Sequence, residues 1–382
     1  MMQTLNEYLN KNYVKCESRE DVPFSIPEEY QDISSIMYRV GKENKIFAFI
    51  GYPKTPMPEG GYPAVVLIHG GGGYAFYEWV TEWTEKGYVA IAPDFYGQQP
   101  EDNIDFSNRR FYAGTDEKRK GVNPLGGPSG WGSFEQLHSE NPWIYFCVMN
   151  AIAAVDLLCA DRRVNSNQIC AAGISWGGVI LLIVSSVEKR IKAASITYSS
   201  AFISDTQWGI DSGIGMLSVE EKELYDRFYD PQTYLDDISC PMYFAGGTND
   251  IAFSFYNRKR TYERVKGPVY LGCRHYFAHD HENGWNGDEN ARFFDCILNG
   301  KKFPTVKTVK LHGKRKVICD FRPQKITCVF TTEDAKSLDM CEWAELEIKD
   351  LEDFMLPESA VAFFIEAVTA EGLRVSSDLY FK

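Results

Sequence analysis

Positive charge is scarce in this chain of 382 residues, which holds 40 basic and 53 acidic residues for a net charge of −13. A protein that binds nucleic acid needs a cationic surface to neutralise phosphates, so we expect no DNA or RNA partner. An anionic membrane surface would repel the chain as well. The sequence also lacks internal repeats and low-complexity segments, and its 44% apolar and 24% charged residues are typical of an ordinary globular protein.

Apolar runs long enough to cross a membrane are missing too. The longest, at 151–160 and 179–185, fall short of the roughly 18 residues that a spanning helix needs, and they predict core helices instead. The N-terminal segment has no basic stretch followed by an apolar one, as a secretion signal would have. We therefore predict a cytoplasmic protein that is not bound to a membrane.

The ten cysteines lack the close, patterned spacing of a disulfide framework, and no two of them form a Cys-x-x-Cys pair. The sequence therefore predicts neither a structural zinc site nor a dithiol redox site. Cys147, Cys159, Cys170 and Cys296 lie within apolar segments, where cysteine behaves as a small buried hydrophobic residue. Reduced thiols agree with a cytoplasmic location.

Apolar runs alternate with helical patterns in the first 300 or so residues. The runs predict strands at 64–69, 88–93, 168–172, 193–198, 241–245 and 268–273. The helical patterns lie at 76–86, 143–158, 177–189, 254–265 and 289–298. Strands that helices cover on both faces have continuous apolar sequences, so this alternation predicts an open, mostly parallel α/β sheet. A hairpin of strands 35–40 and 45–51 precedes it, after a short N-terminal helix.

The chain divides near residue 303. Residues 1–302 form the predicted α/β domain, with an N-terminal extension at 1–34 and long insertions at 97–141 and 200–235. Such insertions are usually lids or binding loops, and passive surface excursions are the alternative. Residues 303–382 predict a small β-sandwich of immunoglobulin or fibronectin type, with short strands at 305–311, 315–320, 325–331, 344–349, 360–369 and 373–379.

Gly173-Ile174-Ser175-Trp176-Gly177 directly follows the strand at 168–172 and directly precedes a helical pattern. This setting is typical of a nucleophile elbow, in which a sharp turn holds a serine at the C-terminal end of a strand. Flanking glycines are needed there because neighbouring chain segments pass too close for side chains. We predict that Ser175 is a nucleophile; an ordinary helix N-cap is the alternative.

Four glycines follow His69 at the end of the first apolar run. Backbone N–H groups of Gly70, Gly71 and Gly72, together with that of Trp176, are suited to stabilise the negative charge that acyl transfer places on a carbonyl oxygen. A phosphate-binding loop is the rival interpretation, but no Gly-Lys-Ser/Thr and no G-x-G-x-x-G pattern opens a helix here. We expect His69 to brace the loop, and a role as catalytic base is the alternative.

Asp250 follows the strand at 241–245 and is the candidate acid of a catalytic triad. A serine nucleophile needs a histidine base, and that histidine needs a carboxylate that fixes its tautomer. The alternative is an aspartate in an ordinary turn, which the Asn-Asp sequence favours.

Three of the six histidines, His275, His279 and His281, follow the last predicted strand of the sheet. His275 lies near the strand end, whereas His279 and His281 lie in the loop where the base belongs. We favour His279 as the base and keep His281 as the alternative. Metal ligation by His279, Asp280 and His281 is disfavoured, because a second cluster of ligands is lacking elsewhere.

Together these segments resemble the α/β-hydrolase superfamily. More narrowly, the chain is similar to the acetyl xylan esterase / cephalosporin-C deacetylase and dienelactone hydrolase-like branch, in the motifs at 173–178, 247–250 and 279–285. The run at 360–381 is similar to the β-sandwich appended to some bacterial members. The resemblance implies a triad of Ser175, His279 and Asp250 and no cofactor. The chain departs from that pattern in offering two candidate histidines and no obvious secretion signal.

We therefore predict a serine esterase that removes short acyl groups, above all acetyl, from small or carbohydrate esters through an acyl-enzyme. Tyr74, Trp143 and Trp285 are candidate substrate-binding residues, and Trp131 and Trp208 also lie near candidate pocket loops. Sugar rings stack on such aromatic faces, so an acetylated oligosaccharide is a candidate substrate; core packing is the alternative role.

Other functions fit the sequence less well. A peptidase of the prolyl-oligopeptidase kind would use the same triad, but residues 1–60 are too short for its N-terminal propeller. A thiolate mechanism is disfavoured because position 175 is serine. A non-catalytic binding protein that works through its β-sandwich is a further alternative. The sequence is compatible with a homo-oligomer and does not specify one.

Overall fold

The computed structural model describes residues 3–382 except 25, 31, 43, 96–136, 138, 312–313 and 334–340. Trp131 and nearly all of the insertion at 97–141 therefore lie outside the described residues. The strands are β1 (Arg19–Asp21), β2 (Ile33–Val40), β3 (Asn44–Gly51), β4 (Tyr62–Ile68), β5 (Val89–Pro93), β6 (Val164–Ile174), β7 (Ile191–Thr197), β8 (Met242–Gly247), β9 (Val269–Arg274), β10 (Val306–Leu311), β11 (Lys314–Cys319), β12 (Pro323–Thr331), β13 (Ala344–Glu347), β14 (Ala362–Thr369), β15 (Arg374–Ser376) and β16 (Tyr380–Phe381). The helices are α1 (Leu5–Asn12), α2 (Tyr77–Glu85), α4 (Trp143–Ala160), α5 (Trp176–Val187), α6 (Gln207–Asp211), α7 (Val219–Phe228), α8 (Phe255–Tyr262), α9 (His281–Trp285) and α10 (Gly287–Leu298), with short 3-10 turns η1 (Glu28–Tyr30), η4 (Ile203–Asp205), η5 (Pro231–Thr233) and η6 (Leu235–Asp237).

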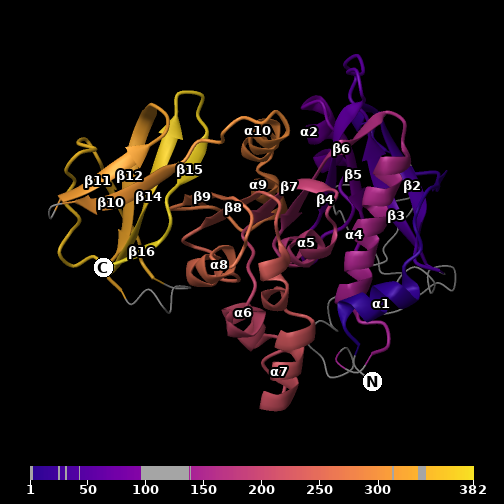
Figure 1. Cartoon of the computed structure of the whole chain (residues 1–382), viewed down its shortest axis with the longest axis horizontal. Helices are drawn as coiled ribbons and strands as arrows, with labels where there is room; N and C mark the ends of the chain where they lie inside the picture. Colours follow the sequence, from indigo (N-terminus) through magenta and orange to yellow (C-terminus); the bar gives the residue numbers. More distant parts are fainter. Residues whose placement is uncertain are drawn as a thin grey trace.

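The α/β part is built on one sheet of nine strands in the order β1-β2-β3-β5-β4-β6-β7-β8-β9 (Figure 1). The neighbouring pairs from β5 to β9 are all parallel, which confirms the mostly parallel sheet. The hairpin of β2 and β3 is also confirmed, and it joins the sheet through an antiparallel pairing of β3 with β5. Strand β1 was not predicted, because its residues Arg-Glu-Asp are polar, as suits an edge strand.

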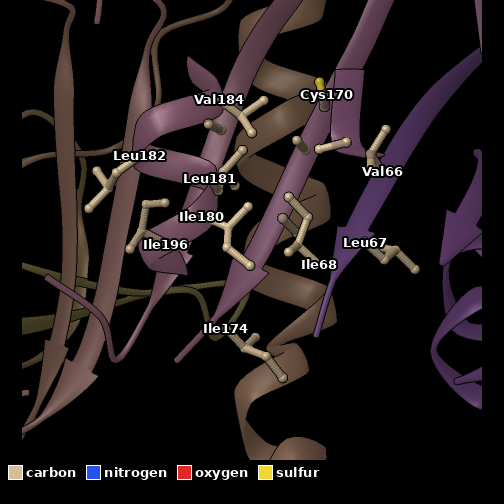
Figure 2. Close-up of a cluster of buried hydrophobic side chains, with 14 of the residues drawn as sticks. Val66, Leu67, Ile68, Cys170, Ile174, Ile180, Leu181, Leu182, Val184 and Ile196 are labelled. Atoms are coloured by element: carbon tan, nitrogen blue, oxygen red, sulfur yellow. The ribbon is translucent and has the colours of Figure 1, made fainter. Parts of the chain in front are cut away.

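Helices α4 and α5 pack against the central strands and are buried along almost their whole length. Figure 2 shows part of this core, in which Ile180 of α5 belongs to the same cluster as Ile68 of β4 and Ile196 of β7. The expected core helix at 151–160 is confirmed, but the expectation that no segment is long and apolar enough for a membrane span was wrong. Among the described residues, α4 is long and apolar enough to cross a membrane by length and composition, but 89% of it is buried inside the fold. It is apolar on all sides because it lies between the sheet and other elements.

The order of the strands creates a switch point beside β4. This strand has β5 on one side and β6 on the other, so the chain crosses to the other half of the sheet between β5 and β6. Loops that leave adjacent strands in opposite directions open a crevice at the C-terminal ends of the strands, where α/β proteins bind ligands. The glycine run after β4 and Ser175 after β6 both lie at this point.

The predicted insertion at 200–235 is a series of short helices, from η4 through α6, α7 and η5 to η6. Asp230 is fully buried and accepts backbone N–H groups of Phe202 at 2.9 Å, Ile203 at 2.6 Å and Gln232 at 2.8 Å. These bonds tie the two ends of the segment together. Its role as a lid stays a prediction.

The cysteines are all free thiols. Cys147 and Cys170 are buried, as the sequence analysis expected, whereas Cys159 and Cys296 are half-buried. Burial raises the pKa of the Cys147 and Cys170 thiols well above the ordinary value, because a thiolate would lose its hydration. These thiols therefore serve as packing groups.

Residues 303–382, here called the C-terminal β unit, contain strands and no helix in the residues that the structure describes. Strands β10 and β11 form a hairpin, and β13, β12, β14 and β15 form a second sheet in that order, with β16 also paired to β14. The all-β character is confirmed, and the immunoglobulin or fibronectin type stays a prediction. In Figure 1 the unit lies next to β9 and α8, at one edge of the large sheet.

Candidate active site

Ser175 is the single residue between β6 and α5, and its backbone is strained. Its φ is 52° and its ψ is −121°, a conformation that residues with a side chain rarely adopt. Its N–H donates to Thr197 O at 3.0 Å, and its carbonyl accepts from Gly178 N at 2.9 Å. Such strain costs about 1–3 kcal/mol and persists only where the surrounding structure enforces it. The strand–turn–helix elbow predicted from the sequence is therefore present.

The glycines around Ser175 leave no room for a methyl group. A Cβ at Gly177 would lie 2.1 Å from Ile68 O, and one at Gly178 would lie 2.5 Å from Ser199 Cβ. A Cβ at Gly173 would lie 2.5 Å from Gly177 O. Two of these contacts involve backbone atoms, which cannot move aside as the end of a side chain can. The Gly-x-Ser-x-Gly-Gly pattern is thus a steric requirement of the close contact between β4, the elbow and α5.

The structure brings Ser175, His279 and Asp250 together in one hydrogen-bonded relay. His279 Nε2 lies 2.9 Å from Ser175 Oγ, and His279 Nδ1 lies 3.0 Å from Asp250 Oδ1. A carboxylate can only accept, so Nδ1 carries the proton, and Nε2 is left to accept the proton of the serine hydroxyl. This is the geometry of a nucleophile, a general base and an orienting acid.

Two aromatic rings that were not predicted from the sequence lie against the ring of His279. The ring of Tyr198 stacks on it at a centroid distance of 4.2 Å, and Phe253 lies on it at 6.1 Å. Burial raises the pKa of Tyr198 well above its ordinary value, so its hydroxyl stays protonated and donates to Asp280 O. These contacts restrict the rotation of the imidazole, and no local sequence signal marks them.

Asp250 is 2% exposed, and its charge is supported by the loop that follows it. Its Oδ1 also accepts the N–H groups of Ala252 at 2.9 Å and Phe253 at 3.0 Å. Arg258 of α8 is 1% exposed, and its Nη1 lies 3.5 Å from Asp250 Oδ2. A buried carboxylate needs such partners, because desolvation otherwise favours its neutral form. Arg258 was not predicted as a site residue, because nothing in the sequence of α8 marks it.

His281, the alternative base, lies against the glycine loop and not between Ser175 and Asp250. It begins α9, and its ring contacts the ring of Phe76 at a centroid distance of 4.9 Å. Its Nε2 lies against the glycine loop, only 2.5 Å from where a Cβ at Gly73 would be. Burial lowers the pKa of His281 to about 4, so the ring is neutral at physiological pH. Of the two candidates, the structure brings His279 and not His281 to both Ser175 and Asp250.

The glycine loop after β4 runs directly past the serine. A Cβ at Gly70 would lie 3.1 Å from Ser175 Cβ, and Gly72 has a φ of 70° with open space around it. His69 Nδ1 lies 2.9 Å from Gly70 O, and His69 Nε2 accepts from Phe95 N at 3.0 Å. Both nitrogens of His69 thus bond to the backbone, which fits the bracing role expected from the sequence.

Trp176 follows Ser175 at the first position of α5, where the helix carries its partial positive charge. The glycine loop at Gly70 and the start of α5 both adjoin Ser175, and each offers backbone N–H donors. Such a pair of donors is the arrangement that an oxyanion needs. Trp176 is only 3% exposed; its ring stacks on Trp143 at 6.1 Å and contacts the tilted ring of Trp208 at 5.3 Å.

The three candidate substrate-binding aromatics have different surroundings. Trp143 is 2% exposed and donates its Nε1–H to Phe95 O at 3.0 Å, so it is a packing residue and not an open platform. Trp285 is half-buried and stacks on Trp79 at 5.9 Å. Tyr74 is half-buried and contacts Phe76 at 4.0 Å. The prediction for Trp143 is therefore corrected, whereas Tyr74 and Trp285 stay candidates.

In the part of the chain that the structure describes, no group of three or more His, Cys, Asp or Glu side chains could hold a metal ion. His279, one of the three residues of the alternative metal set, instead faces Ser175 and Asp250. Asp280 caps α9 by accepting Asn283 N at 2.8 Å. The chemistry that these side chains support is nucleophilic attack by a serine oxygen.

Comparisons with known proteins agree with this arrangement. The sequence model of the Dienelactone hydrolase family matches residues 46–293. This range contains the glycine loop, Ser175, Asp250 and His279. An acetyl esterase, Axe7A of Xylanibacter ruminicola, is 21% identical over 221 residues, which are 55% of this chain and 47% of that protein. The chain thus spans about half the length of this curated relative.

Two solved structures share the fold. The acetyl xylan esterase from Paenibacillus sp. R4 is 18% identical with a TM-score of 0.58. Acetyl xylan esterase 1 from Thermoanaerobacterium sp. JW/SL YS485 is 14% identical with a TM-score of 0.54. In each case 77% of this chain and 92% of the other chain are covered.

Proposed function

The chain belongs to the dienelactone hydrolase family, and from this membership we propose that it is a serine esterase that removes short acyl groups from small or carbohydrate esters. The observation that carries the proposal is the relay from Ser175 Oγ through His279 to Asp250. A serine hydroxyl is a weak nucleophile at neutral pH, and a hydrogen-bonded imidazole is what activates it.

In the acylation step, Ser175 Oγ attacks the ester carbonyl carbon while His279 Nε2 takes the hydroxyl proton. Asp250 holds His279 in the correct tautomer and stabilises the imidazolium that forms. The N–H groups of Trp176 and the Gly70–Gly72 loop bind the oxyanion of the tetrahedral intermediate. When that intermediate collapses, the alcohol leaves with the proton from His279, and the acyl group stays on Ser175.

Deacylation uses the same groups in reverse. Water gives a proton to His279 Nε2 and attacks the acyl carbon, and the carboxylic acid leaves as Ser175 Oγ regains its proton. No redox cofactor or metal ion is required to balance either step. The proposal of an acetyl group as the acyl part is supported by the acetyl esterase and acetyl xylan esterases to which this chain is similar.

The test is the hydrolysis of p-nitrophenyl esters from acetate to octanoate by the wild type and by Ser175→Ala. We expect the wild type to prefer acetate and the variant to lose about 10⁴–10⁶-fold in kcat. Acetylated xylo-oligosaccharides would then test the carbohydrate substrate. Wild-type turnover in Ser175→Ala would contradict the proposed mechanism, and a folded but inactive wild type would direct attention to peptide substrates.

A further inference from the structure

The C-terminal β unit covers the edge of the large sheet at β9, the strand that leads into the loop of His279. Ser376 Oγ accepts Cys273 N at 2.9 Å, so a side chain of the unit satisfies a backbone donor on this edge strand. Tyr243 of β8 donates its hydroxyl to Arg374 O at 3.4 Å. The unit is therefore in contact with the two strands whose loops carry Asp250 and His279.

A separate hydrophobic cluster joins the two parts of the molecule. Its buried members are Phe255, Cys273, Val329, Trp343, Ala362, Phe364 and Leu379. Phe255 of α8 contacts Phe364 at a ring distance of 5.1 Å and Trp343 at 6.2 Å. Burial of these side chains anchors α8 on the C-terminal β unit.

Polar contacts hold α8 from the same side. Asp378 accepts Lys259 Nζ at 2.7 Å and the Tyr262 hydroxyl at 2.5 Å. Arg258 lies next to Lys259 in the sequence, and its guanidinium lies 3.5 Å from Asp250. Helix α8 thus connects the C-terminal β unit with the acid of the triad.

His275 makes a second connection, four positions before His279 in the same loop. Its Nδ1 lies 2.8 Å from Glu345 Oε1, and its Nε2 lies 2.9 Å from Trp343 O. Both partners belong to the β13 region of the C-terminal β unit. Both nitrogens of the ring are thus within hydrogen-bond distance of the C-terminal β unit.

The loops after β8 and β9 are also bonded to each other. Thr248 donates its hydroxyl to His275 O, and Asn249 Oδ1 accepts Phe277 N at 2.9 Å. Asn249 directly precedes Asp250, and Phe277 lies two positions before His279. A displacement of His275 would therefore shift both the acid and the base relative to Ser175.

We propose that the C-terminal β unit is a scaffold for the acid and the base of the triad, with His275 as a positioning residue that fixes the loop of His279. The inference rests on the proposed serine mechanism, because it concerns the distance between His279 and Ser175. Neither His275 nor Glu345 touches the reacting atoms. Their effect is on how often the imidazole lies within hydrogen-bond distance of the serine, and a misplacement of about 1 Å can lower a rate 10²-fold.

The test measures two properties of the wild type and of full-length variants. One is the hydrolysis of p-nitrophenyl acetate, and the other is the labelling of Ser175 by a fluorophosphonate probe, which reacts only with an activated serine. We expect His275→Ala to lower both kcat and the labelling rate of Ser175 by about 10–100-fold, with KM within about twofold of the wild type. His275→Gln, whose amide can still donate to Trp343 O, should recover most of this loss. Glu345→Gln should lose a few-fold, and the matched control Glu347→Gln on the same strand should lose nothing.

The outcomes separate the two proposals. A wild type that does not label at Ser175 would overturn the serine mechanism and this inference with it. Normal labelling and kcat in a folded His275→Ala would overturn the inference alone. A rise in KM at unchanged kcat, or equal losses in Glu345→Gln and Glu347→Gln, would also overturn it. If His275→Ala fails to fold, the comparison of the two glutamate variants decides.

Discussion

The two sides of the proposed triad are built in different ways. Ser175 is held by consecutive segments, from β6 through the elbow to α5, and by glycines that let β4 pass within contact distance. Asp250 and His279 lie in loops after the last two strands of the sheet. Arg258, which supports Asp250, comes from the next helix, whereas the loop of His279 and the strand before it have partners in the distant C-terminal β unit. The serine side is thus locally specified, whereas the acid–base side depends on long-range contacts.

This difference explains which side the sequence reveals more clearly. A strained turn between a strand and a helix requires particular residue types at neighbouring positions, and these form a readable motif. A histidine loop that is anchored by long-range contacts has no such spacing. Residue type and spacing therefore do not distinguish His279 from His281 as the base, although His279 is the one that faces the serine.

The largest expected effect tests this choice between neighbouring histidines. We expect His279→Ala to lower kcat for p-nitrophenyl acetate by about 10⁴–10⁶-fold, because the serine loses its base. His281→Asn should lose less than about 20-fold, because His281 contacts the glycine loop and not the Ser175 hydroxyl. Steady-state kinetics with circular dichroism as the folding control measure both. Equal losses would mean that the base has been assigned to the wrong residue.

The next effect concerns the acid. Asp250→Asn should lower kcat by about 10⁴-fold, because an amide favours the wrong tautomer of His279. Asp280→Asn is the matched control, since this neighbouring aspartate only caps α9 and should stay within about fivefold of the wild type. The measurement is kcat across a pH series. Loss of activity in the control with retention in Asp250→Asn would reverse the assignment of the two carboxyl groups.

On the serine side, a single methyl group should disturb the fold. Gly177→Ala should lower the free energy of unfolding by about 3 kcal/mol, because its Cβ would lie 2.1 Å from Ile68 O. Gly300→Ala is the control, at a φ of 63° with open space around it, and should cost about 1 kcal/mol. Urea unfolding measures both. Wild-type stability in Gly177→Ala would show that the elbow is less crowded than the structure indicates.

The smallest expected effect is a pH dependence from His281, whose ring lies against the glycine loop beside the serine. His281 has a pKa of about 4 when folded, against an ordinary value of 6.5, because burial disfavours its charged form. Between these values the unfolded chain binds more protons than the folded protein, so the free energy of unfolding falls as the pH falls. We expect a loss of about 2 kcal/mol between pH 7 and pH 5 that is absent in His281→Asn. An identical pH dependence in both proteins would contradict the burial of this ring.

The sequence by itself predicted the strands and helices of the α/β part, because helix-covered strands and core helices require nearly continuous apolar residues. The polar edge strand β1 and the helices α6, α7 and α9 were missed there. It also predicted the serine elbow and the glycine loop, because their sterics require glycine at particular positions. Asp250 was recognisable by its place after a strand.

Tertiary structure alone decided how the acid and base are held. The order of the strands in the sheet determines that Trp143 is buried and that His279 faces Ser175. It also determines how Arg258 and His275 support the triad. A motif records contacts between residues close in sequence. Contacts of β9 and α8 with the C-terminal β unit join residues as far as 119 positions apart, and they exist only once the sheet has formed.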